Sequence, residues 1–309
     1  MDPQRLRPEV RKTITSIPRL PFGIRPLIPL AKFIFNAMAG SKIADDVQVD
    51  KVKEDGVDML VYSSKTQSSD AAVVWMFGGG HLAGKPEHMA AIASSIVHRT
   101  GARVFVPRYR LAPKYPFPAD LDDCWCCWSW VVSHADELGI SLEKLAVGGN
   151  SAGGGLAASL AQRICDAGGP QPVAQILFYP MLDDRIAADR SLDEVDNFIW
   201  RNSANHVAWG AYLAPHQPGA AKLPEYASAA RRKDLSKLAP AWIGFGDLDL
   251  FATEDAEYAD RLKRAGIECE ALCVSGVPHA FEAIVPNVDV SKSFVKSAMD
   301  FLAGRFDAA

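Results

Sequence analysis

The sequence predicts an α/β fold with a mostly parallel eight-stranded sheet and helices on both faces. Apolar runs of strand length alternate with helical patterns along most of the 309 residues. One such strand leads directly into a glycine-rich turn that carries Ser151, and a helix of small residues follows. Later strands end in loops that bear Asp249 and His279. This alternation is typical of open α/β sheets, in which functional side chains gather at the carboxyl ends of the strands.

The elements follow from the apolar pattern in chain order. Eight runs have strand character, at residues 47–53, 57–63, 72–77, 102–107, 144–148, 173–179, 240–246 and 268–274. Five segments have a helical pattern, at residues 86–99, 119–137, 153–167, 254–265 and 289–304. Because strands and helices alternate, the helices should serve as crossovers between parallel strands.

Two regions do not follow this alternation and are expected to form a helical cap. Between Asp183 and Pro240 the chain breaks into short helical pieces rich in Ala, Asn and Trp. Near the start, Pro21 to Met38 reads as an amphipathic helix of a lid. The sequence therefore predicts an N-terminal cap segment at 1–45 and a catalytic domain at 46–309, with a cap insertion at about 184–239.

Ser151 is the expected nucleophile because of the backbone around it. It lies in Gly149-Asn150-Ser151-Ala152-Gly153, between the strand Leu145-Ala146-Val147 and a helix that starts near Gly154. Glycines two residues before and after a serine leave room for a strained strand-to-helix turn. The helix also offers free N–H groups and the positive end of its dipole to an oxyanion. A Gly-x-Ser-x-Gly pattern alone is weak, and the strand and helix on either side strengthen it.

A serine nucleophile needs a base, and the base needs an acid that orients it. Asp249 and His279 follow Ser151 in the chain order of the α/β-hydrolase architecture. Asp247 is an alternative acid, and whichever aspartate is not the acid would cap a turn. A solvated loop histidine is the alternative for His279.

His81 follows a glycine run and is interpreted as part of the pocket wall. The other histidines are interpreted as surface, capping or first-turn helical residues: His88, His98, His134, His206 and His216.

The donors for an oxyanion are expected in the loop after an early strand. The strand Ala72 to Phe77 runs into Gly78-Gly79-Gly80-His81, where three glycines allow close approach of the backbone to a ligand. Together with the amide of Ala152, the amides of Gly78, Gly79 and Gly80 could form an oxyanion hole. A phosphate loop is excluded because no Gly-Lys-Ser/Thr ending follows.

These motifs resemble the hormone-sensitive-lipase-like branch of the α/β-hydrolases, which includes many bacterial carboxylesterases. The similarity runs from roughly residue 45 to the C-terminus. The matching segments are Tyr109-Arg110-Leu111-Ala112-Pro113, Tyr115-Pro116-Phe117-Pro118-Ala119, Asn150-Ser151-Ala152-Gly153-Gly154, Tyr179-Pro180-Met181-Leu182-Asp183-Asp184-Arg185, Gly246-Asp247-Leu248-Asp249-Leu250-Phe251 and Pro278-His279-Ala280-Phe281. The resemblance implies a serine carboxylesterase for short to medium acyl esters, with Asp249 as the acid and no metal or organic cofactor. It also implies a homodimer through the edge strand at 268–274.

The chain departs from this family at two positions. Phe77 stands where the family has a histidine that braces the oxyanion loop, and His81 stands where it has a large aromatic residue. Phe77 is expected only to pack, so the loop is expected to be less rigid or braced by other groups. Asn150 replaces an aspartate, which is a mild change because both side chains are short and form hydrogen bonds.

Two other functions remain open from the sequence. An amidase or deacetylase would use the same triad. A small-molecule receptor that has lost catalysis would be expected to lack one of the three residues, yet Ser151, Asp249 and His279 are all present.

Composition excludes several other classes. The formal net charge of −4 gives no basic excess for nucleic acid. The stretch from Ile24 to Ala39 is too short and interrupted to span a bilayer, although a membrane-touching surface remains an alternative. The charged start, Met1 to Lys12, does not resemble a secretory signal. The six cysteines are interpreted as free thiols in a reducing cytoplasm, because no second C-x-x-C pair completes a zinc site.

Overall fold

The computed structural model describes residues 2–38, 42–66 and 69–309 and has one eight-stranded sheet. The strand order is β1-β2-β4-β3-β5-β6-β7-β8. The strands are β1 (Val47–Glu54), β2 (Val57–Ser64), β3 (Ala72–Met76), β4 (Arg103–Pro107), β5 (Leu145–Asn150), β6 (Ala174–Phe178), β7 (Ala241–Gly246) and β8 (Cys269–Val274). β2 pairs antiparallel with both β1 and β4, and the other neighbours are parallel. The predicted mostly parallel sheet is confirmed, with each strand end within two residues of its predicted place.

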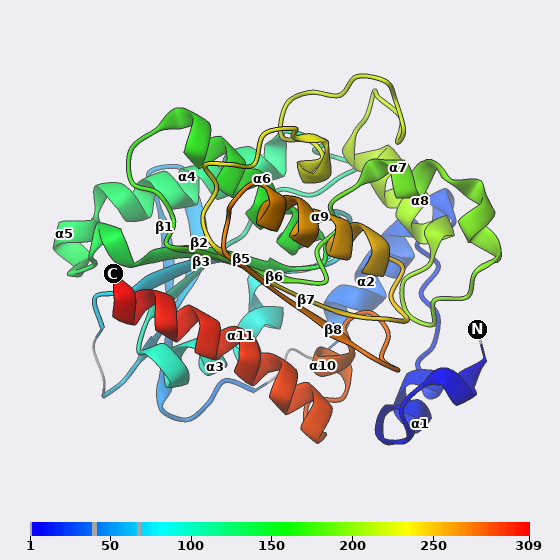
Figure 1. Cartoon of the computed structure of the whole chain (residues 1–309), viewed down its shortest axis with the longest axis horizontal. Coiled ribbons are helices and arrows are strands. Elements are labelled where there is room, and N and C mark those ends of the chain that lie inside the picture. The colour runs from blue at the N-terminus through cyan, green and yellow to red at the C-terminus, as the bar shows by residue number, and fades with distance from the viewer. Residues whose placement is uncertain (1, 39–41, 67–68) are drawn as a thin grey trace.

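Helices cover both faces of this sheet, as predicted. α4, α6 and α9 lie on one face, and α3 and α11 lie side by side on the other (Figure 1). The helices are α1 (Pro8–Ser16), α2 (Ile28–Ala37), α3 (Ala90–Thr100), α4 (Ala119–Ser133), α5 (Ala135–Leu138), α6 (Ala152–Ala167), α7 (Asp184–Ala188), α8 (Asn202–Tyr212), α9 (Ala252–Arg264), α10 (Phe281–Ile284) and α11 (Asp289–Ala308). The sheet is therefore the middle layer of three.

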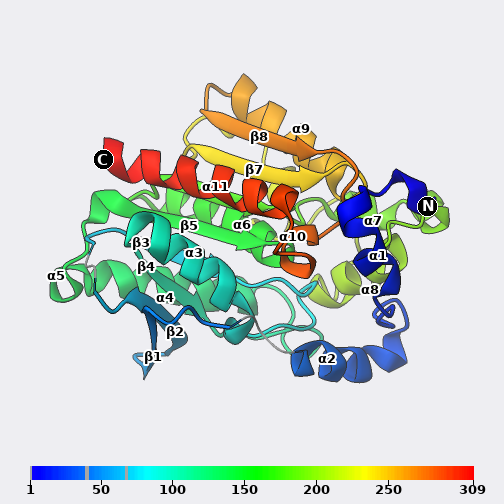
Figure 2. The same cartoon turned by 90° about the horizontal axis from the view of Figure 1, so that it is seen from below.

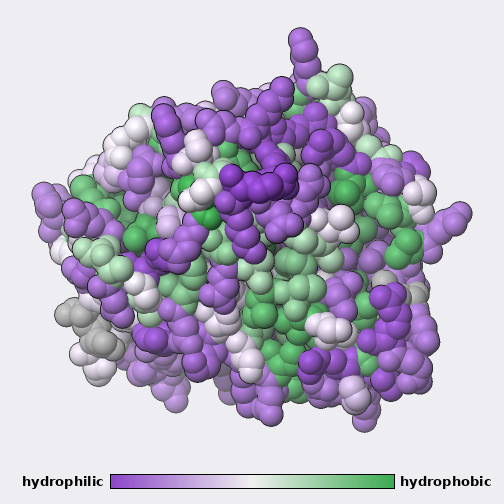
Figure 3. All heavy atoms as spheres, viewed as in Figure 1, coloured by the Kyte–Doolittle hydropathy of each residue, from purple (hydrophilic) through white to green (hydrophobic). Residues whose placement is uncertain are grey.

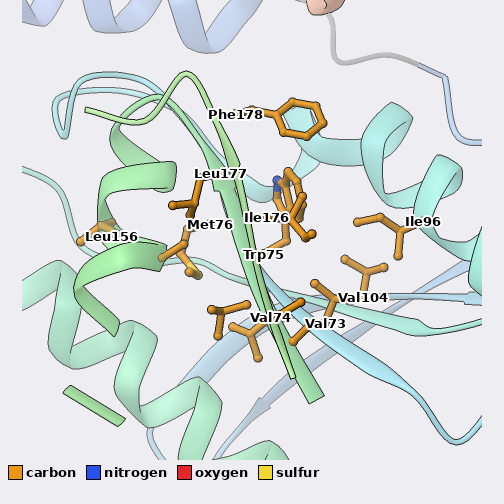
Figure 4. Packing of buried hydrophobic residues seen from close by; sticks show 14 of the residues in the cluster. Val73, Val74, Trp75, Met76, Ile96, Val104, Leu156, Ile176, Leu177 and Phe178 are labelled. Carbon is orange, nitrogen blue, oxygen red and sulfur yellow. The ribbon is translucent and has the colours of Figure 1, made fainter. Parts of the chain in front are cut away.

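The central strands are buried on both faces, so their apolar runs are continuous. In β3, Val73 and Trp75 point toward α3, whereas Val74 and Met76 point toward α6 (Figure 4). Trp75 packs over Gly148 of β5, where a methyl group would lie only 2.6 Å from the indole ring. The small residue in β5 is required by this packing, because a side chain there would displace the tryptophan.

Four helix predictions differ from the structure in extent. The helix predicted at 86–99 begins only at Ala90, after a 3₁₀ turn at Pro86–Met89, and the helix predicted at 289–304 continues to Ala308. The predicted helix at Pro21–Met38 begins only at Ile28, after a 3₁₀ turn at residues 25–27. Prolines at 21 and 26 supply no N–H to a helical ladder, whereas Pro29 lies in the first turn of α2, where no donor is needed. The predicted helix at 119–137 is interrupted at His134 and continues as α5. Helix α1 was not predicted.

Parts of the N-terminal segment and of the insertion share a second hydrophobic cluster. Phe22, Ile28 and Ala31 join residues of α8 and the loop after β3 in this cluster. Other buried residues of the same two regions belong to the core of the sheet: Leu6, Val10, Ile14, Ala229, Ala230, Leu235 and Leu238. The predicted segment at 1–45 includes residues 1 and 39–41, which lie outside the described residues. No helix among the described residues is both long and apolar enough to cross a membrane.

Candidate active site

Ser151 lies at the junction of β5 and α6 with a strained backbone. Its φ is 56° and its ψ is −124°, a conformation that a non-glycine residue rarely adopts. The surroundings hold it there: its N–H donates to the Phe178 carbonyl at 2.9 Å, and its own carbonyl accepts from Met181 N at 3.0 Å. A methyl group at Gly149 would lie 2.3 Å from the Gly153 carbonyl oxygen, so the turn closes only with glycine there.

The three side chains predicted from the sequence meet in one hydrogen-bonded chain. His279 Nε2 lies 2.9 Å from Ser151 Oγ, and His279 Nδ1 lies 2.6 Å from Asp249 Oδ2. All three residues are at most 8% exposed. An ionised carboxylate only accepts hydrogen bonds, so Nδ1 carries the proton and Nε2 is free to accept one from the serine. The arrangement can therefore deprotonate a serine during nucleophilic attack.

The structure also distinguishes the two candidate aspartates. Asp247 accepts hydrogen bonds from Ser275 Oγ at 2.9 Å and from Gly276 N at 2.7 Å. It thus caps the loop that leads to His279. The other oxygen of Asp249, Oδ1, accepts a hydrogen bond from the Phe251 N–H at 3.0 Å. The carboxylate facing the imidazole is Asp249, and its orientation is set by the start of α9.

The glycine loop after β3 lies against the serine. A methyl group at Gly78 would come within 3.2 Å of Ser151 Cβ. Gly79 has a φ of +134°, and a methyl group there would lie 2.1 Å from the Ala83 carbonyl oxygen, so only glycine fits. In the described part of the chain, the amides of Gly79, Gly80 and Ala152 have no hydrogen-bond acceptor. The loop therefore has donors available beside the hydroxyl.

Phe77, which replaces the bracing histidine of the family, is itself held by Tyr109. The two rings stack with centroids 4.0 Å apart and planes at 8°. The Tyr109 hydroxyl donates to the Phe77 carbonyl. On the other side of the loop, the Asn36 side chain of α2 accepts the N–H of Gly84 at 2.8 Å. The expectation that Phe77 packs is met, and other groups brace the loop.

His81 is buried inside the same loop. Its Nδ1 lies 2.8 Å from Asp120 Oδ2 in α4, and its ring stacks on Tyr212 of α8 with centroids 3.8 Å apart. The residue is 3% exposed and has a φ of 59°. His81 joins the loop to α4 through Asp120 and to α8 through Tyr212, and its place in the pocket wall stays a prediction. Asp120 was missed because an acid in a first helical turn usually needs no tertiary partner.

A further carboxyl lies behind the imidazole of His279. Glu282, in α10, accepts a hydrogen bond from the Tyr179 hydroxyl at 2.5 Å. The Tyr179 ring packs edge-on against the His279 ring, with centroids 4.7 Å apart. Burial raises the pKa of Glu282 to about 7, although the Tyr179 hydroxyl and the nearby His279 oppose this shift. No sequence pattern indicates this pair, because α10 is a single short turn.

Two more buried acids lie in α9, close to Asp249. Glu254 accepts the N–H groups of Leu182 at 2.7 Å and Asp183 at 3.2 Å, where the chain enters the insertion. Asp255 is fully buried, and neither of its oxygens has a partner among the described residues. Burial raises the pKa of both carboxyls well above their usual range. Within the described chain, no group of three or more His, Cys, Asp or Glu residues has the arrangement of a metal site.

A cavity of about 410 Å³ lies between α3 and α11, on the face of the sheet opposite α6. Its lining includes Trp75, Asn150, Glu282 and Met299, but not Ser151. Neither Asp249 nor His279 lines the cavity, so it does not open onto the chain of hydrogen bonds around the serine hydroxyl.

Comparison with known proteins matches this architecture. A family model described as the alpha/beta hydrolase fold matches residues 73–283. Carboxylesterase NlhH of Mycobacterium tuberculosis is 37% identical over 205 residues, which cover 64% of this chain and 62% of that protein. Esterase LipI of the same organism is 30% identical over 220 residues, covering 70% of this chain and 67% of that protein.

A solved structure agrees over nearly the whole chain. The structure of a bacterial heroin esterase superimposes with a TM-score of 0.92 at 28% identity and covers 98% of both chains. The chain belongs to the α/β-hydrolase fold family, and its motifs resemble those of the hormone-sensitive-lipase-like branch within it.

Proposed function

We propose that the protein is a serine carboxylesterase that hydrolyses short to medium acyl esters through an acyl-enzyme intermediate. Ser151 is the nucleophile, His279 the general base and acid, and Asp249 the residue that orients the imidazole. The observation that supports this most directly is the chain from Ser151 Oγ through both ring nitrogens of His279 to Asp249. The named relatives, which are esterases, support the same reaction class.

In the first half-reaction, His279 Nε2 takes the proton of Ser151 while Oγ attacks the ester carbonyl carbon. Asp249 stabilises the imidazolium that forms. The carbonyl oxygen becomes an oxyanion, which accepts hydrogen bonds from the amides of Gly78, Gly79 and Ala152, with Gly80 as a further donor. One such donor contributes about 3 kcal/mol to the barrier reduction. His279 then donates its proton to the departing alcohol.

In the second half-reaction, His279 removes a proton from water, and the resulting hydroxide attacks the acyl group on Ser151. The tetrahedral species collapses, the serine oxygen regains its proton from His279, and the carboxylic acid leaves. We propose that no metal or organic cofactor takes part, because the proton transfers and charge stabilisation are supplied by these side chains and amides.

The experiment is a series of p-nitrophenyl esters with acyl chains of increasing length, measured with the parent protein and with Ser151→Ala. We expect a maximum at short to medium chains, and a loss of at least about a thousandfold in kcat for the variant. A folded Ser151→Ala variant with parental activity would refute the role of Ser151. Circular dichroism spectra that superimpose establish that the variant is folded.

The two alternatives give different results in related assays. An amidase or deacetylase would cleave an anilide at a rate comparable to that of the p-nitrophenyl ester with the same acyl group. A receptor without catalysis would leave Ser151 unlabelled by a fluorophosphonate, whereas we expect stoichiometric labelling of the parent protein and none of Ser151→Ala.

Three further proposals concern organisation. The residues at 1–45 and at about 184–239 form the cap of a catalytic domain at 46–309, supported by the hydrophobic cluster that they share. β8 is an edge strand, which supports a homodimer through residues 268–274. All six cysteines are free, which supports the cytoplasmic location expected from the sequence.

A further inference from the structure

Helix α2 exposes an apolar face. Seven of the ten exposed large hydrophobic side chains in the described chain lie between residues 24 and 43. Four of them, Leu27, Leu30, Ile34 and Met38, recur at helical spacing, and Phe33 beside them is 72% exposed. We call these five residues the α2 stripe. Contiguous exposed apolar surface of this kind marks an interaction site.

The opposite face of α2 is already occupied, so the helix cannot turn to bury the stripe. Ile28 and Ala31 are buried, and Phe35 packs edge-on against Phe22 with centroids 6.2 Å apart. Asn36 accepts the N–H of Gly84 from the loop beside Ser151. Figure 2 shows α2 at the outer edge of the molecule, away from the sheet. The stripe therefore faces solvent, on the side of α2 opposite the loop beside Ser151.

The segment that carries the stripe is basic. Within residues 20–38 the charged side chains are Arg25 and Lys32, a local net charge of +2 with no acid, in a chain whose formal net charge is −4. Farther toward the N-terminus, Arg7 and Arg19 are paired with Glu9 and Asp196. Arg25 lies immediately before the stripe and is exposed. A symmetric contact between two copies through this face would bring Arg25 and Lys32 of both copies together with no acid between them, which disfavours a second copy as the partner.

We propose that the α2 stripe and its basic surroundings form a docking surface for anionic phospholipid bilayers. An apolar helix face flanked by arginine and lysine lies in the headgroup region, where apolar burial and attraction to anionic lipid act together. The contact is peripheral, since α2 is a ten-residue helix fixed to the protein on its other side. The surface is independent of the hydrolytic chemistry.

The test is co-sedimentation of the full chain with sucrose-loaded vesicles. One set contains phosphatidylcholine with phosphatidylglycerol, and the other contains phosphatidylcholine alone. We expect at least about tenfold stronger binding to the anionic vesicles, decreasing as salt is added. Absence of binding to the anionic vesicles, or equal binding to both sets, would overturn the proposal.

A matched pair of double variants separates the stripe from a general charge effect. Leu30→Asp with Phe33→Asp is expected to lower binding to anionic vesicles at least about tenfold. Leu142→Asp with Val195→Asp makes the same charge change at two side chains that are each 39% exposed elsewhere, and binding should be nearly unchanged. Thermal unfolding followed by circular dichroism checks that both are folded.

Equal loss of binding in the two doubles would overturn the assignment to the stripe. Light scattering gives the other decisive result. If the parent protein is a dimer that the Leu30→Asp, Phe33→Asp variant converts to a monomer, the stripe is a contact between two copies and the lipid proposal is wrong.

Discussion

Two buried histidine–aspartate pairs lie in the described part of the chain, and they share their first contact but differ in their second. His279 Nδ1 lies 2.6 Å from Asp249, and His81 Nδ1 lies 2.8 Å from Asp120. The other ring nitrogen of His279 reaches Ser151 Oγ. The His81 ring instead lies flat on Tyr212, at 19° between planes, whereas Tyr179 and Phe251 touch His279 edge-on.

This difference shows that a buried histidine–aspartate pair is not sufficient to indicate catalysis. The His279 pair orients a nitrogen toward a hydroxyl, so its geometry can transfer a proton. The His81 pair joins the glycine loop to α4 and, through Tyr212, to α8, so its geometry can hold the loop in place. Substitutions in the two pairs test whether the His279 pair transfers a proton and the His81 pair only holds the loop.

The largest contrast is expected between Asp249→Asn and Asp120→Asn. An amide at 249 can donate to Nδ1 and so favours the wrong tautomer, which should lower kcat on a p-nitrophenyl ester by about 10⁴-fold. The same substitution at 120 should change kcat by less than about tenfold, because no reacting proton depends on it. Steady-state kinetics of the two folded variants measure this. Comparable losses in kcat would end the distinction between the pairs.

The second prediction is that the His81–Asp120 pair contributes to the stability of the fold. His81→Phe keeps an aromatic ring on Tyr212 but leaves the buried Asp120 carboxyl without its imidazole partner. We expect a loss of about 3 kcal/mol in the free energy of unfolding, measured by urea titration. Adding Asp120→Leu to this variant should restore part of the loss, since neither partner then carries an unpaired charge. No recovery in the double variant would contradict a direct pair.

The third prediction concerns Glu282, a buried carboxyl near His279. Its pKa is raised from 4.5 to about 7 in the folded protein, so the folded state keeps a proton that the unfolded state releases. The contribution to stability is present below pH 4.5 and is lost as the pH rises through about 7. Its full extent is about 3 kcal/mol.

Glu282→Gln removes this titration but keeps an oxygen that can accept from Tyr179. The free energy of unfolding of the variant relative to the parent should therefore increase between about pH 5 and about pH 8. Urea titrations at both pH values measure the change, with Glu257→Gln on the exposed side of α9 as the matched control. For the control, the free energy of unfolding relative to the parent should be the same at both pH values. The same result for Glu282→Gln would show that Glu282 does not titrate in this range.

The smallest effect is expected from Tyr109→Phe. The ring can still stack on Phe77, but the hydrogen bond to the Phe77 carbonyl is lost. We expect a loss of about 1 kcal/mol in stability and a several-fold lower kcat, because the amides that we propose for the oxyanion hole follow directly in the chain. Thermal unfolding and ester kinetics measure both. An unchanged kcat would show that the loop does not depend on this brace.

The sequence alone predicted the sheet, the order of its elements and the three residues of the candidate triad. These features have local causes: apolar runs define the strands, and glycines around Ser151 permit one strained turn. Chain order then related Ser151 and His279 to an acid at 247 or 249, because parallel strands end at the same edge of the sheet, and the family resemblance favoured Asp249. The structure places their atoms within hydrogen-bonding distance, and their catalytic roles stay a prediction.

The tertiary structure decided which polar side chains pair across distant elements. Asp247 and Asp249 are equivalent in a local pattern, and only the position of the His279 loop assigns them different partners. The same holds for Asp120 with His81 and for Tyr179 with Glu282. Such pairs depend on the three-dimensional distance between loops, which spacing along the chain does not encode. Burial then sets their energies, because removing water strengthens each contact and penalises each unpaired charge.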